Sequence, residues 1–223
     1  MFNRIAFRYD LLNRFLSGGI DVYWRKRAVK ELVEINPQYI LDVATGTADV
    51  AIMMTKYLRP KKITGIDISE AMLAIGEQKI TKLKLKGSIT LQTGDSEAIN
   101  FPDDSFDAIT VAFGVRNFES LEKGLKEMLR VLKPRGKLVV LEFSKPKQAG
   151  FKGLYNLYMR LVAPRIGKLV SKNEEAYQYL NDSVKAFPQG NDFLAILNKT
   201  GYDNTYLKTL TLGISTIYCG VKK

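Results

Sequence analysis

Acidic and small residues gather in three short segments of the sequence, each directly after an apolar run that could form a buried strand. The first segment covers residues 42–49 and reads DVATGTAD, the second ends at Asp67, and the third is Gly94-Asp95-Ser96. Because the carboxyl ends of parallel strands meet at one edge of a sheet, we expect the three segments to line one crevice. Carboxylates in such a crevice can accept hydrogen bonds from a sugar and can attract a cation.

The first segment argues against a dinucleotide site. A dinucleotide fold needs the pattern Gly-x-Gly-x-x-Gly, so that backbone amides and a helix N-terminus face a pyrophosphate. Here Gly46 is the single glycine of the turn, and Asp42 stands at the strand end. Its carboxylate would repel phosphates but would favour an ammonium or sulfonium group. The alternative is that the small residues only allow a strand and a helix to pack closely.

The other two segments are suited to an adenosine. Asp67 could accept hydrogen bonds from both ribose hydroxyls, and Asp95 with the backbone amide of Ser96 could pair with the adenine edge. Together the three segments predict binding of S-adenosylmethionine, with S-adenosylhomocysteine as the product. The residues assigned to the cofactor are Asp42, Gly46, Thr47, Asp67, Asp95, Ser96 and Ala112.

Composition removes several kinds of chemistry. The 223 residues include no histidine and a single cysteine, Cys219, which excludes a Ser-His-Asp triad, an imidazole metal ligand and an internal disulfide. We expect no metal site and a reducing, cytoplasmic setting. Lys and Arg number 34 against 23 Asp and Glu, and the net charge of +11 indicates an anionic partner: nucleic acid, an acidic membrane surface or a charged substrate.

Apolar runs alternate with helical patterns along most of the chain, which predicts a doubly wound α/β sheet of the Rossmann-like kind. Ser69 is the expected N-cap of one helix. The predicted strands are 39–44, 62–67, 88–93, 106–113, 137–143, 202–210 and 212–221, and the predicted helices are 22–35, 48–58, 70–83, 121–132 and 192–200. An antiparallel C-terminal hairpin on this mostly parallel seven-stranded sheet is a feature of class I methyltransferases.

We expect one methyltransferase domain over residues 1–223. Within it, residues 1–36 are predicted to form an N-terminal helical cap and 37–146 the cofactor-binding core. Two successive helical patterns interrupt the alternation and predict a helical cap insertion over 147–188. Residues 189–223 would supply the last helix and the hairpin.

Three blocks of sequence then identify a family. They are YDLLNRFLS at residues 9–17 followed by Trp24-Arg25, FGVRN at 113–117, and RVLKPRGK at 130–137 continuing to LEFSKP at 141–146. With these blocks the chain resembles, nearly end to end, the C-methyltransferases of ubiquinone and menaquinone biosynthesis. It departs from the family at three positions: Asp21 where the family commonly has His, and Ala48 and Arg135 where it commonly has Gly.

The resemblance implies that a prenylated quinol is methylated on a ring carbon. Demethylmenaquinol is the expected substrate, and 2-methoxy-6-polyprenyl-benzoquinol is the alternative. The ring becomes nucleophilic when a hydroxyl ionises, which for a phenol with a pKa of about 10 costs about 4 kcal/mol at neutral pH. A guanidinium about 4 Å away offers a similar gross Coulomb energy. We expect Arg116 to supply that charge and Asn117 to orient the substrate.

The general base stays open on the sequence alone. The candidates are Asp21, Asp49, Tyr9 and a water held by Arg116, although Asp49 could simply cap a helix and Tyr9 could only pack. Tyr9, Asn13 and Asp21 are also the residues expected to contact the substrate.

The region that follows the core suggests how the protein reaches a lipid. Between residues 145 and 172 there are basic residues and no acidic one. An apolar helical face in the same stretch either packs on the core or meets a membrane. We therefore expect peripheral contact with an anionic membrane at the inner face of the cell membrane.

Rival functions rest on the net charge. An RNA methyltransferase is disfavoured because the fourth strand lacks the Asn/Asp-Pro-Pro-aromatic ending typical of base methylation, so we expect no nucleic acid partner. A non-catalytic S-adenosylmethionine binder or an NAD-linked reductase is disfavoured by Asp42 and the missing glycines. Assembly into a homodimer stays open.

Overall fold

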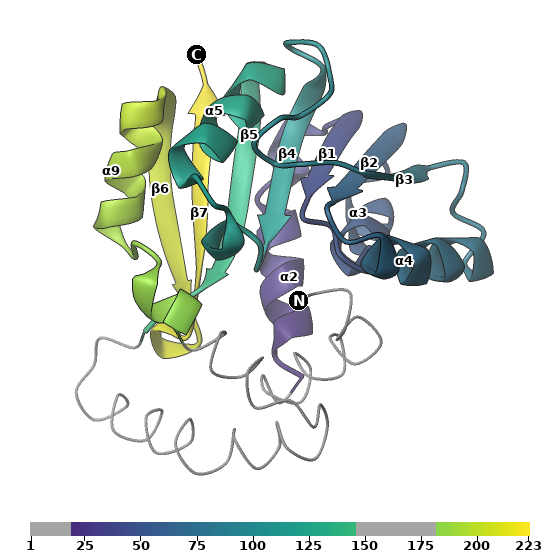
Figure 1. Ribbon diagram of the computed structural model, residues 1–223, viewed down its shortest axis with the longest axis horizontal. Helices are drawn as coiled ribbons and strands as arrows, with labels where there is room; N and C mark the ends of the chain where they lie inside the picture. The colour runs from purple at the N-terminus through teal and green to yellow at the C-terminus, as the bar shows by residue number, and fades with distance from the viewer. Residues whose placement is uncertain (1–18, 146–181) are drawn as a thin grey trace.

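The computed structural model describes residues 19–145 and 182–223, and within them the chain forms a seven-stranded sheet (Figure 1). The strand order is β3-β2-β1-β4-β5-β7-β6. Strands β1 to β5 pair in parallel, whereas β7 runs antiparallel to both β5 and β6. The strands are β1 Tyr39–Val43, β2 Lys62–Asp67, β3 Ile89–Thr93, β4 Phe106–Ala112, β5 Leu132–Phe143, β6 Tyr202–Leu210 and β7 Ser215–Lys222. The predicted fold class and closing hairpin are confirmed.

Helices cover both faces of the sheet. Residues of α2 (Asp21–Lys30), α3 (Asp49–Tyr57) and α4 (Glu70–Lys82) share one buried apolar cluster. Residues of α5 (Leu121–Val131) and α9 (Asn191–Thr200) share a second cluster on the opposite face. There are also three short 3₁₀ turns, η1 Val33–Ile35, η2 Val115–Asn117 and η3 Thr211–Gly213, and a helical stretch at residues 182–186.

The strands in the middle of the sheet, β1, β4 and the second half of β5, are largely apolar because both of their faces are buried. Along β5, Val139 packs in the cluster of α2 and α3, and its neighbour Val140 packs in the cluster of α5 and α9. In β7, Cys219 packs in the cluster of α2 and α3, and Tyr218 packs in the cluster of α5 and α9. This explains why the sequence shows continuous apolar runs rather than an alternating pattern.

Several boundaries follow local chemistry. Ser69 is the N-cap of α4, since its hydroxyl accepts a hydrogen bond from the Met72 backbone amide at 3.3 Å, as predicted. The helix predicted over 22–35 ends at Lys30, and η1 follows before Asn36 turns left-handed at φ 44° ahead of Pro37. Strand β5 begins at Leu132, earlier than predicted, because the chain continues through a register shift instead of breaking.

Helix α2 is fixed on the sheet by Trp24. The indole is 1% exposed, its ring centroid lies 6.0 Å from that of Phe143 in an edge-to-face contact, and its Nε1 donates to the Thr211 hydroxyl at 2.7 Å. This part of the segment predicted as an N-terminal cap therefore packs on the core. Residues 1–18 of that segment and 147–181 of the predicted insertion lie outside the described residues. Within the described ranges, no helix has the length and apolar character to cross a membrane.

Candidate active site

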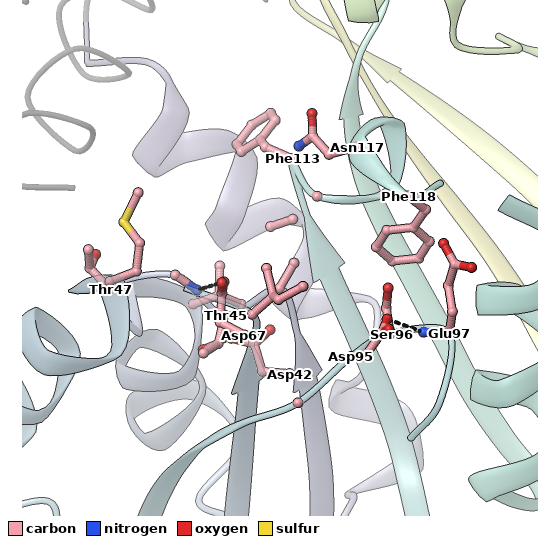
Figure 2. Close-up of a pocket in the computed structure, with 18 of the residues that line it drawn as sticks. Asp42, Thr45, Thr47, Asp67, Asp95, Ser96, Glu97, Phe113, Asn117 and Phe118 are labelled. Carbon is pink, nitrogen blue, oxygen red and sulfur yellow. Dashed lines mark hydrogen bonds between the residues drawn. The ribbon is translucent and has the colours of Figure 1, made fainter. Parts of the chain in front are cut away.

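A cavity of about 400 Å³ lies at the carboxyl ends of strands β1 to β4 (Figure 2). The predicted convergence of the three acidic segments on one crevice is confirmed, because every residue assigned to the cofactor lines this cavity. These residues are Asp42, Gly46, Thr47, Asp67, Asp95, Ser96 and Ala112. Strand ends at a topological switch point commonly bind ligands in sheets of this kind.

The turn after β1 holds an unusual backbone against the cavity. Ala44, Gly46 and Ala48 all have positive φ, at 53°, 57° and 65°. A left-handed conformation is unfavourable for alanine by roughly 1–2 kcal/mol, and such strain concentrates at ligand sites. Gly114 of the neighbouring turn touches this loop, since a Cβ there would lie 2.5 Å from the Ala44 Cβ. The two loops therefore approach so closely that a side chain larger than hydrogen at position 114 would collide with Ala44.

The Asp42 side chain stabilises the turn after β1 through hydrogen bonds. It is buried and accepts hydrogen bonds from the hydroxyl groups of Thr45, at 2.7 Å, and Thr110. Burial raises the pKa of Asp42 to about 6, against the lowering effect of the two hydroxyls. The carboxylate still lines the cavity, but its hydrogen bonds go to the protein.

Asp67 is fixed by two backbone amides. Its Oδ2 accepts from the Gly46 amide and its Oδ1 from the Ser69 amide, each at 2.8 Å. Burial raises the pKa of Asp67 above its ordinary value although these amides oppose it. The Ile68 amide also lowers this pKa. A carboxylate has about four acceptor positions, so acceptor capacity remains for a ribose hydroxyl.

Asp95, Ser96 and Phe118 form one end of the cavity (Figure 2). Asp95 Oδ1 accepts from the Glu97 amide at 2.8 Å, and Glu97 in turn accepts from the Ser120 amide at 2.7 Å. An aromatic ring beside a polar loop is suited to a flat base. Phe118 is not among the site residues predicted from the sequence. Its position directly after the FGVRN block could have indicated that it belongs to the site.

Asp49 lies at the opposite side of the cavity between two cations. Its Oδ2 is 2.7 Å from Arg25 Nη1 and its Oδ1 is 2.7 Å from Lys79 Nζ, which also donates to the Thr47 hydroxyl at 2.7 Å. Burial alone would raise the pKa of Asp49, but Arg25 and Lys79 lower it overall. A carboxylate held in this way is a weak proton acceptor, so the geometry favours a positioning role for Asp49 over that of general base.

The neighbours Arg116 and Asn117 face different surroundings. Asn117 lines the cavity, whereas the Arg116 Nη1 lies 2.7 Å from Glu142 Oε1 and donates to the Phe113 carbonyl at 2.6 Å. The side chains of Arg116 and Glu142 are 3% and 0% exposed. The guanidinium is thus held in a buried ion pair next to the lining residue Phe113, and Arg116 itself is not among the residues that line the described cavity.

The expected substrate residues are only partly placed. Asp21 is buried in α2, with its Oδ2 3.8 Å from Arg25 Nη2, and it is not among the residues that line the described cavity. Tyr9 and Asn13 lie outside the described residues.

Comparison with known proteins decides the family. A family model described as the ubiE/COQ5 methyltransferase family matches residues 1–222. The chain belongs to this family. It is 46% identical over 222 residues to a demethylmenaquinone methyltransferase of Bacteroides fragilis, covering 100% of this chain and 91% of the relative. It is 50% identical over 223 residues to the ubiquinone/menaquinone biosynthesis C-methyltransferase UbiE of Geotalea daltonii, covering 100% and 94%.

The fold comparison agrees with this assignment. The crystal structure of an S-adenosylmethionine-dependent methyltransferase from Thermotoga maritima matches with a TM-score of 0.68 at 20% identity, covering 100% of this chain and 98% of that one. At that identity the likeness concerns the fold. As a member of the ubiE/COQ5 methyltransferase family, the protein is an enzyme that depends on S-adenosylmethionine.

The residues of the cavity fit this cofactor. Acidic groups dominate the lining, which suits a ligand with an ammonium and a sulfonium group: Asp42, Asp49, Asp67, Asp95, Glu97 and Glu119. Asp67 keeps acceptor capacity for a ribose hydroxyl, and Phe118 lies at the Asp95 end of the cavity. Bound there, the cofactor would supply an electrophilic methyl group.

Proposed function

We propose that the protein methylates a ring carbon of demethylmenaquinol to give menaquinol. The observation that carries the proposal is the combination of an adenosine-sized acidic cavity with relatives of that name matched over the whole chain. Relatives named for both ubiquinone and menaquinone biosynthesis keep the benzoquinol as the second candidate substrate.

Each residue then has a defined task. Asp67 accepts hydrogen bonds from the ribose hydroxyls, and Asp95 with the Ser96 amide addresses the adenine. Asn117, which lines the cavity, donates to or accepts from a quinol hydroxyl. Arg116 acts as a positioning residue: its ion pair with Glu142 and its bond to the Phe113 carbonyl fix the turn that presents Asn117.

A lipid substrate calls for contact with a membrane. The net charge of +11 and the basic stretch from 145 to 172 support docking on an anionic lipid surface. We place the working enzyme at the inner face of the cell membrane, held by charge and by a modest apolar contact rather than by an anchor.

The test is complementation of a bacterial strain that lacks its own demethylmenaquinone methyltransferase. Expression of the wild-type chain should replace demethylmenaquinone by menaquinone in a mass spectrum of the lipid extract, and an Asp67→Ala variant is the matched control. Methylated benzoquinone without menaquinone would assign the second substrate instead. Unchanged demethylmenaquinone, with the protein expressed and folded, would contradict the proposal.

A further inference from the structure

Arg25 is a buried cation with unused hydrogen-bond donors beside the cavity. It lines the cavity, and its side chain is 8% exposed. A guanidinium has five N–H donors. Nη1 donates to Asp49 at 2.7 Å, Asp21 lies farther away at 3.8 Å, and the buried Nε has no hydrogen-bond partner among residues 19–145 and 182–223. Because unsatisfied donors on a buried charge are unfavourable, such an arginine indicates an anionic ligand.

Arg25 also differs in charge from most of its surroundings. Among the described residues that line the cavity, the cations are Arg25 and Lys123, and the acidic side chains outnumber them. Lys123 belongs to α5, the helix that follows Phe118. In Figure 2, Thr47 lies on one side of the cavity and Ser96 on the other, with Asp67 between them. Arg25 is on the Thr47 side, because it shares Asp49 with Lys79, the lysine bonded to Thr47.

We propose that Arg25 binds the α-carboxylate of S-adenosylmethionine. The inference rests on the proposed placement of the ribose at Asp67 and the adenine at Asp95. The amino-acid end of the cofactor lies opposite its adenine, and the carboxylate there is its one anionic group. In a cavity rich in carboxylates that group needs a cation, and Arg25 stands on the required side.

Three helices hold the guanidinium in place. Trp24 anchors α2 to the sheet, Asp49 at the start of α3 binds Nη1, and Lys79 of α4 holds the other oxygen of Asp49. Asp49 pairs with both Arg25 and Lys79, so its single negative charge is divided between two cations. Thus α2 brings a ligand-binding residue to the core in addition to packing on it.

The experiment compares two ligands by calorimetry on the full chain. S-Adenosylhomocysteine carries the amino-acid end, and 5′-methylthioadenosine keeps the adenosine but lacks that end. In Arg25→Gln we expect the affinity for S-adenosylhomocysteine to fall by about ten- to a hundredfold, the range for a hydrogen bond to a charged group. Methylthioadenosine should bind as it does to wild type. The control Lys123→Gln should change both affinities by the same factor.

Equal effects of Arg25→Gln on both ligands, or no effect on either, would overturn the assignment. Wild-type protein that binds neither ligand would instead count against the cofactor site itself, so the two failures are distinguishable. A ligand-side measurement covers the case in which the variant does not fold. Wild-type protein should bind decarboxylated S-adenosylmethionine at least tenfold more weakly than S-adenosylmethionine, and equal affinities would again refute the role of Arg25.

Discussion

The buried ion pair between Arg116 and Glu142 gives the sharpest test of how the active-site turn is held. We consider Glu142→Gln, which keeps the size of the side chain and an acceptor oxygen but removes the charge. The two groups lie 2.7 Å apart with side chains 3% and 0% exposed. At an effective dielectric near 20 the gross Coulomb energy at that distance is about 6 kcal/mol.

The net loss is smaller than the gross energy. Breaking a buried pair by removing one partner typically lowers the free energy of unfolding by about 3–5 kcal/mol, because the remaining charge stays in a site built for a pair. For a chain of this size each kcal/mol shifts the melting temperature by about 2–4 °C. We therefore expect Glu142→Gln to melt about 6–20 °C below wild type.

The assay is thermal unfolding followed by circular dichroism, with turnover measured below the transition. The surface pair of Glu122 and Lys199, 2.8 Å apart with side chains 48% and 73% exposed, supplies the control. Exposed pairs contribute little, so Glu122→Gln should leave the melting curve unchanged. Turnover should fall in Glu142→Gln while cofactor affinity holds, since Asn117 loses its support. If Glu142→Gln has the melting temperature of the wild type, or keeps full turnover, the positioning role assigned to the ion pair is wrong.

Three further predictions concern the cofactor, the pH dependence and the membrane. Asp67→Ala should weaken S-adenosylhomocysteine binding by about 1.5–3 kcal/mol, the range for hydrogen bonds to a charged group, and unchanged affinity in calorimetry would remove Asp67 from the site. Because the pKa of Asp42 is raised from 3.8 to about 6, the folded state holds its proton longer than the unfolded state. This group therefore lowers stability as pH rises from about 4 to about 6. In urea titrations, Asp42→Asn should gain stability relative to wild type across that window, and a constant difference would count against the raised pKa. Reversing Lys152, Arg160 and Lys168 to Glu should reduce co-sedimentation with anionic vesicles, and wild-type sedimentation would exclude this segment from docking.

The sequence was sufficient for most of the framework. Strand β2 over Lys62–Asp67 and the cap at Ser69 were predicted correctly because apolar runs, turns and caps are local signals. The start of β5 was missed because Lys133, Pro134 and Arg135 indicate a break. The chain instead pairs with β4 at Leu132 and again from Lys137, across a register shift that contains the left-handed Arg135 at φ 64°.

The site was predictable only where residues follow strand ends. Asp67 ends strand β2, Asp95 follows strand β3, and both line the cavity as expected. Arg25 and Lys79 lie within helices, and their shared contact with Asp49 depends on how those helices dock, which no local pattern encodes. Arg116 and Asn117 are neighbours on a turn with about three residues per revolution, so they point about 120° apart. Residue type alone could not tell which of the two faces the cavity.

Methyl transfer by the purified protein tests the central claim most directly. The enzyme would be incubated with S-adenosylmethionine carrying a ¹³C-labelled methyl group and a short-chain demethylmenaquinol, and the product examined by mass spectrometry and NMR. We predict that the labelled methyl appears on the ring carbon beside a hydroxyl, and that Asp67→Ala abolishes or sharply slows its appearance. Label on a quinol oxygen, or no labelled quinone from folded protein that binds S-adenosylhomocysteine, would contradict the account.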